Sequence, residues 1–143
     1  MPARTVYLIK RIETEVTTKM NKALAEYDIT LSQFTVLNFV NDNPNDLSSA
    51  QLSRRFNMTP QSMNEVVTTL QRKELIEKNV DADNKRILLI NLTEKGVGIL
   101  KQCNETVNDV EKALFKALSN ADLQTLRSLI GTVLTDIRNT VTT

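Results

Sequence analysis

The sequence has no histidine and no tryptophan, and only one cysteine, three glycines and three prolines among its 143 residues. Histidine is the commonest metal ligand and general base, so its absence beside a single cysteine argues against a zinc site. The sequence also has no glycine-rich phosphate loop and no pairing of a nucleophile with a base. We therefore expect no cofactor and no metal, and we predict that the protein is not an enzyme.

Long apolar runs are missing as well. No stretch of 18 or more apolar residues occurs, which argues against a membrane-spanning helix. Residues 1–11 lack the apolar segment and small residues of a secretory signal, and the lone Cys103 cannot form an intramolecular disulfide. We therefore expect a cytoplasmic protein. The formal net charge of +1 leaves room for a few placed phosphate contacts rather than for bulk electrostatic binding.

The scarcity of glycine and proline favours long helices, and apolar residues recur at helical spacing. In residues 4–27 they form one stripe: Val6, Ile9, Ile12, Val16, Met20, Leu24 and Tyr27. A small domain cannot bury the whole of so long a stripe, so packing against a partner subunit is one interpretation and packing within the chain is another. A second helix begins at the Thr30-x-x-Gln33 capping box, and Asn38 on it is expected to face solvent.

Two short helices joined by a tight turn come next. Ser48-x-x-Gln51 is a capping box for the first, and Thr59 and Pro60 suit the N-cap and first position of the second. The helix at 59–73 has one apolar side and one side of hydrogen-bonding side chains. In a helix–turn–helix the second helix enters the major groove of DNA. The alternative is a surface helix whose polar side chains are only solvated.

Two β-rich segments, 75–80 and 86–92, flank a polar loop and predict an antiparallel pair. The loop does not match a calcium-binding EF-hand, because Arg86 and Leu92 stand where that loop needs glycine and glutamate. A helix restarts at 93–96, and the last helix carries a wide apolar face: Leu123, Leu126, Leu129, Ile130, Val133, Leu134, Ile137 and Val141. We therefore predict a mainly α fold with a small antiparallel β wing, in the order four helices, strand pair, two helices.

The run from residue 52 to residue 96 resembles the MarR family of bacterial winged helix-turn-helix regulators. The matching features are Leu70…Leu75-Ile76, the Asp81…Lys85-Arg86 wing and Leu92-Thr93-Glu94-Lys95-Gly96, and the flanking helices extend the resemblance over nearly the whole chain. It implies one MarR-like domain over 1–143, with a winged-helix DNA-binding lobe at 31–95 and a helical dimerisation region at 1–30 and 96–143. It also implies a homodimeric transcriptional repressor that binds double-stranded DNA and is released by a small aromatic or amphipathic effector.

Carried onto this sequence, the resemblance assigns DNA contacts to helix and wing residues: Thr59, Gln61, Ser62, Asn64, Thr68, Arg72, Lys85 and Arg86. Gln and Asn suit adenine, Ser and Thr suit bases or phosphates, and Arg72 suits phosphate. The chain departs from the family pattern at four places. Glu65 stands where a basic residue is common, Glu74 replaces a glycine, Ala82 replaces a proline, and Asp83 with Asn84 leaves the wing tip without positive charge.

Several residues keep more than one interpretation. Glu65 either accepts a hydrogen bond from cytosine N4, repels the DNA backbone, or pairs within the protein. Cys103 is either a redox sensor or a buried small apolar residue, and its place on an apolar stripe favours the second. Tyr27, Phe34 and Phe39 either line an effector site or pack in the core. The alternative function is a winged-helix module that binds proteins and does not read DNA.

Overall fold

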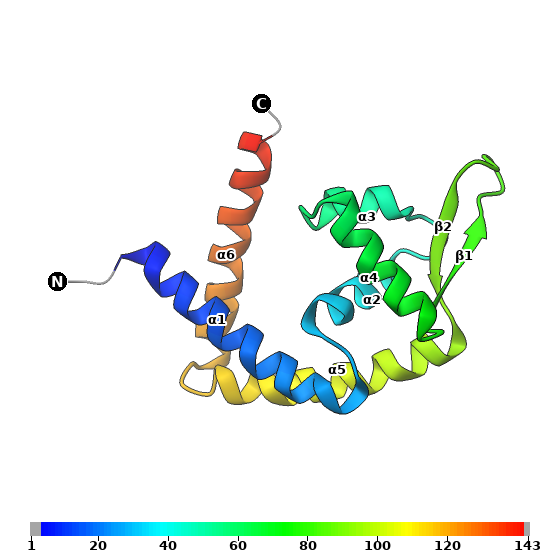
Figure 1. Ribbon diagram of the computed structural model, residues 1–143. Helices are drawn as coiled ribbons and strands as arrows, with labels where there is room; N and C mark the ends of the chain where they lie inside the picture. Colours follow the sequence, from blue (N-terminus) through cyan, green and yellow to red (C-terminus); the bar gives the residue numbers. More distant parts are fainter. Residues whose placement is uncertain (1–3, 142–143) are drawn as a thin grey trace. The chain divides into compact units, whose positions relative to one another are not determined.

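The computed structural model describes residues 4–141, with side chains described as far as Asn139. Its elements, labelled in Figure 1, are α1 (Thr5–Leu24), the 3-10 helix η1 (Ala25–Tyr27), α2 (Leu31–Asp42), α3 (Ser49–Arg55), α4 (Pro60–Arg72), β1 (Ile76–Val80), β2 (Leu88–Leu92), α5 (Glu94–Leu114) and α6 (Asn120–Val141). This order confirms the prediction of a mainly α fold with a two-stranded wing. Residues 1–3 and 142–143 of the expected domain, and the side chain of Val141, lie outside the described residues. The chain divides into two compact units between Asn108 and Asp109, within α5.

The predicted caps begin the helices of the first unit. At α2 the backbone N–H of Gln33 donates to Thr30 Oγ1 (3.2 Å), and the N–H of Thr30 donates to Gln33 Oε1 (3.1 Å). The same reciprocal pair joins Ser48 and Gln51 at α3, at 3.2 and 2.8 Å. Each pair satisfies two backbone donors that a helix start leaves without an intrahelical partner. These local signals therefore set where α2 and α3 begin.

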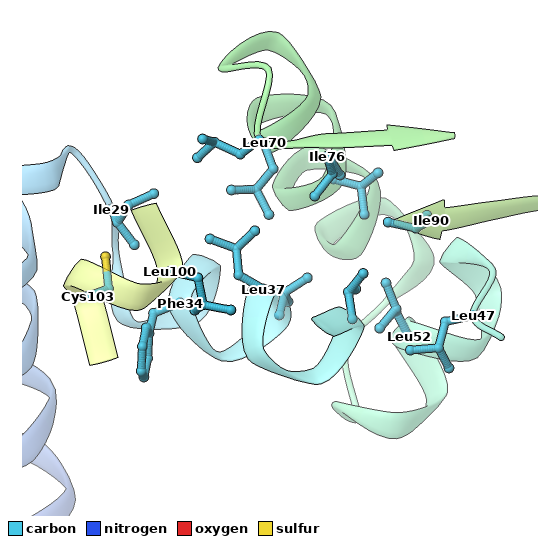
Figure 2. Close-up of a cluster of buried hydrophobic side chains, with 14 of the residues drawn as sticks. Ile29, Phe34, Leu37, Leu47, Leu52, Leu70, Ile76, Ile90, Leu100 and Cys103 are labelled. Carbon is cyan, nitrogen blue, oxygen red and sulfur yellow. The ribbon is translucent and has the colours of Figure 1, made fainter. Parts of the chain in front are cut away.

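One apolar cluster holds α2, α3, α4, the hairpin and the first half of α5 together (Figure 2). Leu37, Leu52, Leu70 and Ile90 come from four different elements and have no exposed surface. Burying a side chain of this size contributes about 1.5–3 kcal/mol each. Helix α4 has several consecutive β-branched residues and a poor helix propensity, so this packing is what stabilises it.

The wing is an antiparallel hairpin with a defined register. Ile76 pairs with Leu92, Lys78 with Ile90, and Val80 with Leu88. The N–H of Ile90 donates to the carbonyl of Leu47 (2.8 Å), so the segment before α3 lies beside β2. Ile76 and Ile90 are buried, whereas Val80 and Leu88 extend beyond the lobe and are exposed. The inner end of the hairpin therefore belongs to the core, and its outer end projects into solvent.

Two polar contacts connect α5 to α2 and to η1. The Asn38 and Asn104 amides donate to each other's oxygens, at 3.4 and 3.2 Å, and both residues are half-buried. The expectation that Asn38 faces solvent is therefore wrong: a polar residue on an apolar face is stabilised here by a matching amide on α5. The hydroxyls of Tyr27 and Thr106 are also hydrogen-bonded, at 2.8 Å.

In the second unit, α6 begins where Ser119 caps it, with the N–H of Asp122 donating to Ser119 Oγ (3.1 Å). Its apolar side chains from Leu129 to Ile137 are exposed, as are those of the first two turns of α1 in the first unit. Within the described residues, no helix combines the length and apolar character needed to cross a membrane.

Candidate nucleic-acid interface

The candidate interface lies on α4, whose orientation is set by its buried side. Met63, Val67 and Leu70 have no exposed surface. The opposite side carries every helix residue predicted to contact DNA, and all six are exposed: Thr59, Gln61, Ser62, Asn64, Thr68 and Arg72. Packing of the apolar side therefore fixes which side chains the helix presents outward.

A shallow hollow lies on this outward face. It is lined by Gln61, Asn64, Glu65, Thr68, Thr69 and Arg72. Four of the predicted residues thus line one surface, together with Glu65 and Thr69, whereas Thr59 and Ser62 lie at the N-terminal end of the helix outside it. The hollow offers amide, hydroxyl, carboxylate and guanidinium groups, which together can donate to and accept from base edges.

Thr59 and Ser62 form the N-terminal cap of α4. The N–H of Ser62 donates to Thr59 Oγ1 (3.1 Å), and the Thr59 hydroxyl donates to Ser62 Oγ (2.9 Å). The Thr59 hydroxyl thus both donates and accepts a hydrogen bond within the cap, whereas the Ser62 hydroxyl can still donate to another molecule. Of these two residues, Ser62 is the better placed to contact a base or a phosphate.

Asn64 has a partner that the sequence did not reveal. The hydroxyl of Ser49, on the first turn of α3, donates to Asn64 Oδ1 (2.9 Å). This bond between the two helices orients the amide, and its nitrogen remains able to donate to a base. The capping box at Ser48 places Ser49 at the start of α3, but no local pattern predicts a contact with a residue fifteen positions later.

Glu65 is exposed at the centre of this face. Among the described residues it forms no ion pair, so pairing within the protein does not account for it there. Its neighbours in the hollow are mostly neutral, and the only cationic one is Arg72, seven residues further along the helix.

Helix α4 ends in a regular C-terminal capping motif, although Glu74 replaces the expected glycine. The N–H of Glu74 donates to the Gln71 carbonyl (2.9 Å), and the N–H of Leu75 donates to the Leu70 carbonyl (3.0 Å). Glu74 adopts a left-handed conformation with φ 63°. This pair of bonds is the Schellman motif, so the departure from the family pattern changes the residue and keeps the helix end.

Lys73 anchors the same end of α4 to the segment before α2. Its ammonium pairs with the Asp28 carboxylate (3.4 Å), and it donates to the Asp28 carbonyl and to Gln33 Oε1 (3.3 Å). Since Gln33 also caps α2, the end of α4 and the start of α2 share this contact.

The wing loop is shaped by its acidic and amide residues. Asp81 Oδ1 accepts from the N–H of Asp83 (3.0 Å), and Asn84 Oδ1 accepts from the N–H of Arg86 (3.1 Å). Such turns are a common use of Asp and Asn in tight loops. The loop presents Lys85 and Arg86 to solvent, outside the hollow on α4. The absence of positive charge at Asn84 therefore has a structural reason.

The candidate sensor and effector residues belong to the core. Cys103 has no exposed surface, and burial raises the pKa of its thiol above the ordinary value, which disfavours the reactive thiolate. Phe34 is buried, and Phe39 packs edge-on against Phe56 with ring centroids 5.4 Å apart. Tyr27 packs against the same cluster. No group of His, Cys, Asp or Glu in the described chain is arranged to hold a metal.

Comparison with known proteins identifies the same architecture. A model described as the MarR family matches residues 27–87. The uncharacterized HTH-type transcriptional regulator YdcH of Bacillus subtilis is 30% identical over 102 residues, covering 69% of this chain and 69% of that protein. The HTH-type transcriptional repressor Rv2887 of Mycobacterium tuberculosis is 27% identical over 113 residues, covering 79% of this chain and 81% of that protein.

A solved structure gives the same result over most of the chain. A mutant MarR from E. coli, complexed with operator DNA, superposes with a TM-score of 0.80 at 26% sequence identity, covering 90% of this chain and 91% of that chain. The helix–turn–helix, the wing and the flanking helices thus agree with the family in sequence and in fold. The chain belongs to the MarR family of transcriptional regulators.

Proposed function

We propose that this protein is a cytoplasmic homodimeric repressor that binds a specific double-stranded DNA sequence and is released by a small effector. The observation that carries the proposal is the outward face of α4, where exposed hydrogen-bonding side chains line a hollow on a helix held by the core. A helix fits the major groove, which is about 12 Å wide, and there each base pair presents a distinct set of donors and acceptors.

In this proposal residues 31–95 form the DNA-binding lobe. Gln61, Ser62, Asn64 and Thr68 contact base edges, and Arg72 contacts phosphate. Lys85 and Arg86 on the exposed wing loop reach the sugar–phosphate backbone or the minor groove. The MarR–operator complex supports this assignment, because that relative shares the fold over most of the chain. The name of the M. tuberculosis relative supports repression rather than activation.

Dimerisation is assigned to the helical regions 1–30 and 96–143. Support comes from exposed apolar side chains on two helices: Val6, Ile9 and Ile12 on α1, and Leu129, Ile130, Val133, Leu134 and Ile137 on α6. Such surfaces mark interaction sites when they are contiguous. A two-fold dimer would present two copies of α4 to an operator with matching pseudo-palindromic symmetry. Release by an aromatic or amphipathic compound rests on the family resemblance.

The deciding experiment is selection of bound duplexes from a random pool with the purified protein. We expect one enriched, pseudo-palindromic motif whose affinity falls steeply as salt rises. Asn64→Ala should reduce affinity and relax preference at one position, whereas Arg86→Ala should weaken binding to all duplexes and lower the salt slope by about one. Unchanged affinity in both variants would mean that the assigned face is wrong.

A protein-binding winged helix is the second candidate, and the observation that favours it is the exposed carboxylate of Glu65 in the centre of the face. No enriched duplex in the selection would support that candidate instead.

A further inference from the structure

The structure raises a question about Glu65 that DNA binding alone does not answer. The side chain lies in the hollow with Gln61 four residues before it and Thr68 three residues after it. It is exposed and, in the described part of the chain, it takes no part in an ion pair. Because Met63 and Val67 are fully buried on the other side of α4, the helix cannot turn Glu65 away from a bound duplex without leaving the core.

A carboxylate in this position penalises binding to an arbitrary duplex. DNA carries one negative charge for about every 1.7 Å of helix axis, and burying an ionised group without a hydrogen-bond partner is unfavourable. The penalty is offset only where a base offers a donor. In the major groove the donors are the amino groups of cytosine N4 and adenine N6.

Of these two donors, cytosine suits a carboxylate better. The adenine amino group lies between the N7 acceptor of its own base and the O4 acceptor of thymine, and both would face carboxylate oxygens. The cytosine amino group has an acceptor, guanine O6, on one side only. Asn64, whose oxygen is engaged by Ser49, still has an amide nitrogen that can donate to guanine acceptors nearby.

We propose that Glu65 is a specificity-determining residue that accepts a hydrogen bond from a cytosine amino group in the operator and rejects duplexes without one. This inference rests on the proposed function, because it assumes that α4 enters the major groove. The side chain then acts in both directions: it strengthens binding to the correct site and weakens binding to every other sequence.

The test is a cycle of two protein forms and two duplexes. The duplex motif is first selected with the wild-type protein, and the cytosine position that loses its preference in a parallel selection with Glu65→Ala is identified. Affinities of both proteins are then measured by fluorescence anisotropy for the selected duplex and for one with that C·G pair changed to T·A. Glu105→Ala is the matched control, because it removes the same charge from an exposed position on α5.

We expect Glu65→Ala to bind the selected duplex about tenfold more weakly and to bind unrelated duplexes as well as or better than the wild type. The C·G to T·A change should cost the wild type about tenfold and the variant almost nothing. Glu65→Gln should retain part of the preference, because its amide oxygen still accepts. Glu105→Ala should leave the preference unchanged.

Two results would overturn the inference, and they are distinguishable. If Glu65→Ala binds selected and unrelated duplexes more tightly by the same factor, Glu65 only repels DNA, and the proposed function stands. If the wild-type protein enriches no duplex, both the inference and the proposed function fail. Circular dichroism melting of each variant verifies that the exposed substitutions leave the fold intact.

Discussion

At the scale of single residues, Glu74 occupies a strained backbone position at the end of α4. Its φ of 63° lies in the left-handed region, which costs an ordinary L-residue about 1–2 kcal/mol. The conformation persists because the bonds of the Schellman motif and the Thr93 hydroxyl, which donates to the Glu74 carbonyl (2.6 Å), hold it.

Glu74→Gly should therefore stabilise the protein. Glycine adopts this conformation without strain, but it gains entropy in the unfolded chain, so the net increase in unfolding free energy should be about 0.5–1 kcal/mol. Urea denaturation at a fixed protein concentration measures it. Glu105→Gly, within the regular helix α5, should instead lose about 1 kcal/mol. A loss of stability in Glu74→Gly would show that the glutamate side chain makes a compensating contact.

Gly96 is required for a close approach between α5 and the end of α4. A Cβ added to Gly96 would lie 2.0 Å from the Leu75 carbonyl oxygen, which also accepts the N–H of Thr93 (3.1 Å). Because the obstructing atom is backbone, it cannot rotate away.

Gly96→Ala should lower the unfolding free energy by about 1–3 kcal/mol, the usual cost of forcing extra atoms into a packed site. Gly98→Ala is the matched control, since nothing lies within 4 Å of its added Cβ, and alanine should gain about 0.5–1 kcal/mol in the helix. Thermal melting of both variants measures the difference. Equal stability of the two would mean that the α5 start shifts to accommodate the methyl group.

At the scale of elements, local patterns were sufficient to predict the winged helix. Helical spacing, the capping boxes at Thr30 and Ser48, and Pro60 after Thr59 depend on residues within one turn of each other. The structure confirms these helix starts. The strand segments were also found, although β1 and β2 begin one or two residues later than expected.

What local patterns could not provide is the set of contacts between elements. Ser49 with Asn64, Asn38 with Asn104, and Lys73 with Asp28 join residues 15 to 66 positions apart. Each pair involves residue types that are ordinarily solvated, so only the packing of the helices brings them together. The exposed face of α4 was predictable because it lies opposite the apolar stripe. The hydrogen bonds that each side chain on this face forms were not predictable.

The Asn38–Asn104 pair shows how such a contact stabilises the packing of α2 on α5. Removing one amide leaves its partner half-buried without its hydrogen bonds, which costs more than losing both. Asn38→Ala or Asn104→Ala should each lower the unfolding free energy by about 1 kcal/mol. The double variant Asn38→Ala/Asn104→Ala should cost less than the sum of the two single changes, as denaturant titration in a double-mutant cycle would measure.

Asn41→Ala, an exposed position on the same helix, is the control for this cycle and should change stability by less than about 0.5 kcal/mol. Strictly additive losses in the cycle would indicate that the two amides are solvated independently.

At the scale of the whole molecule, the exposed apolar side chains of α1 and α6 fit the proposal of a homodimer. MarR-family proteins are transcriptional regulators and not enzymes, in agreement with the prediction made from the missing catalytic residues. The exposed fraction is 73% for Val6 and 61% for Leu134, values unusual for large apolar side chains in a chain with a well-buried core. A second copy of the chain would remove these surfaces from water.

Ile12→Glu and Leu134→Glu should therefore convert the proposed dimer to monomer. An unpaired charge placed in an apolar interface costs about 3–5 kcal/mol, so the dimer dissociation constant should rise at least about a hundredfold. Sedimentation equilibrium over a range of protein concentrations measures this change. Operator affinity should fall with it, because one half-site then replaces two, while the affinity for a single half-site should not change.

Val80→Glu provides the comparison for these two variants, since Val80 is equally apolar and 58% exposed but lies on the outer end of the wing. It should remain dimeric. Lys85 and Arg86 lie in the loop that follows Val80 in the same hairpin. The added negative charge should therefore weaken operator binding without changing the oligomeric state. Dissociation of all three variants, or of none, would contradict the assignment of dimerisation to α1 and α6. We expect only the two helix variants to dissociate into monomers, and we expect all three variants to lose affinity for DNA. This pattern would separate the dimer surface from the DNA-binding surface.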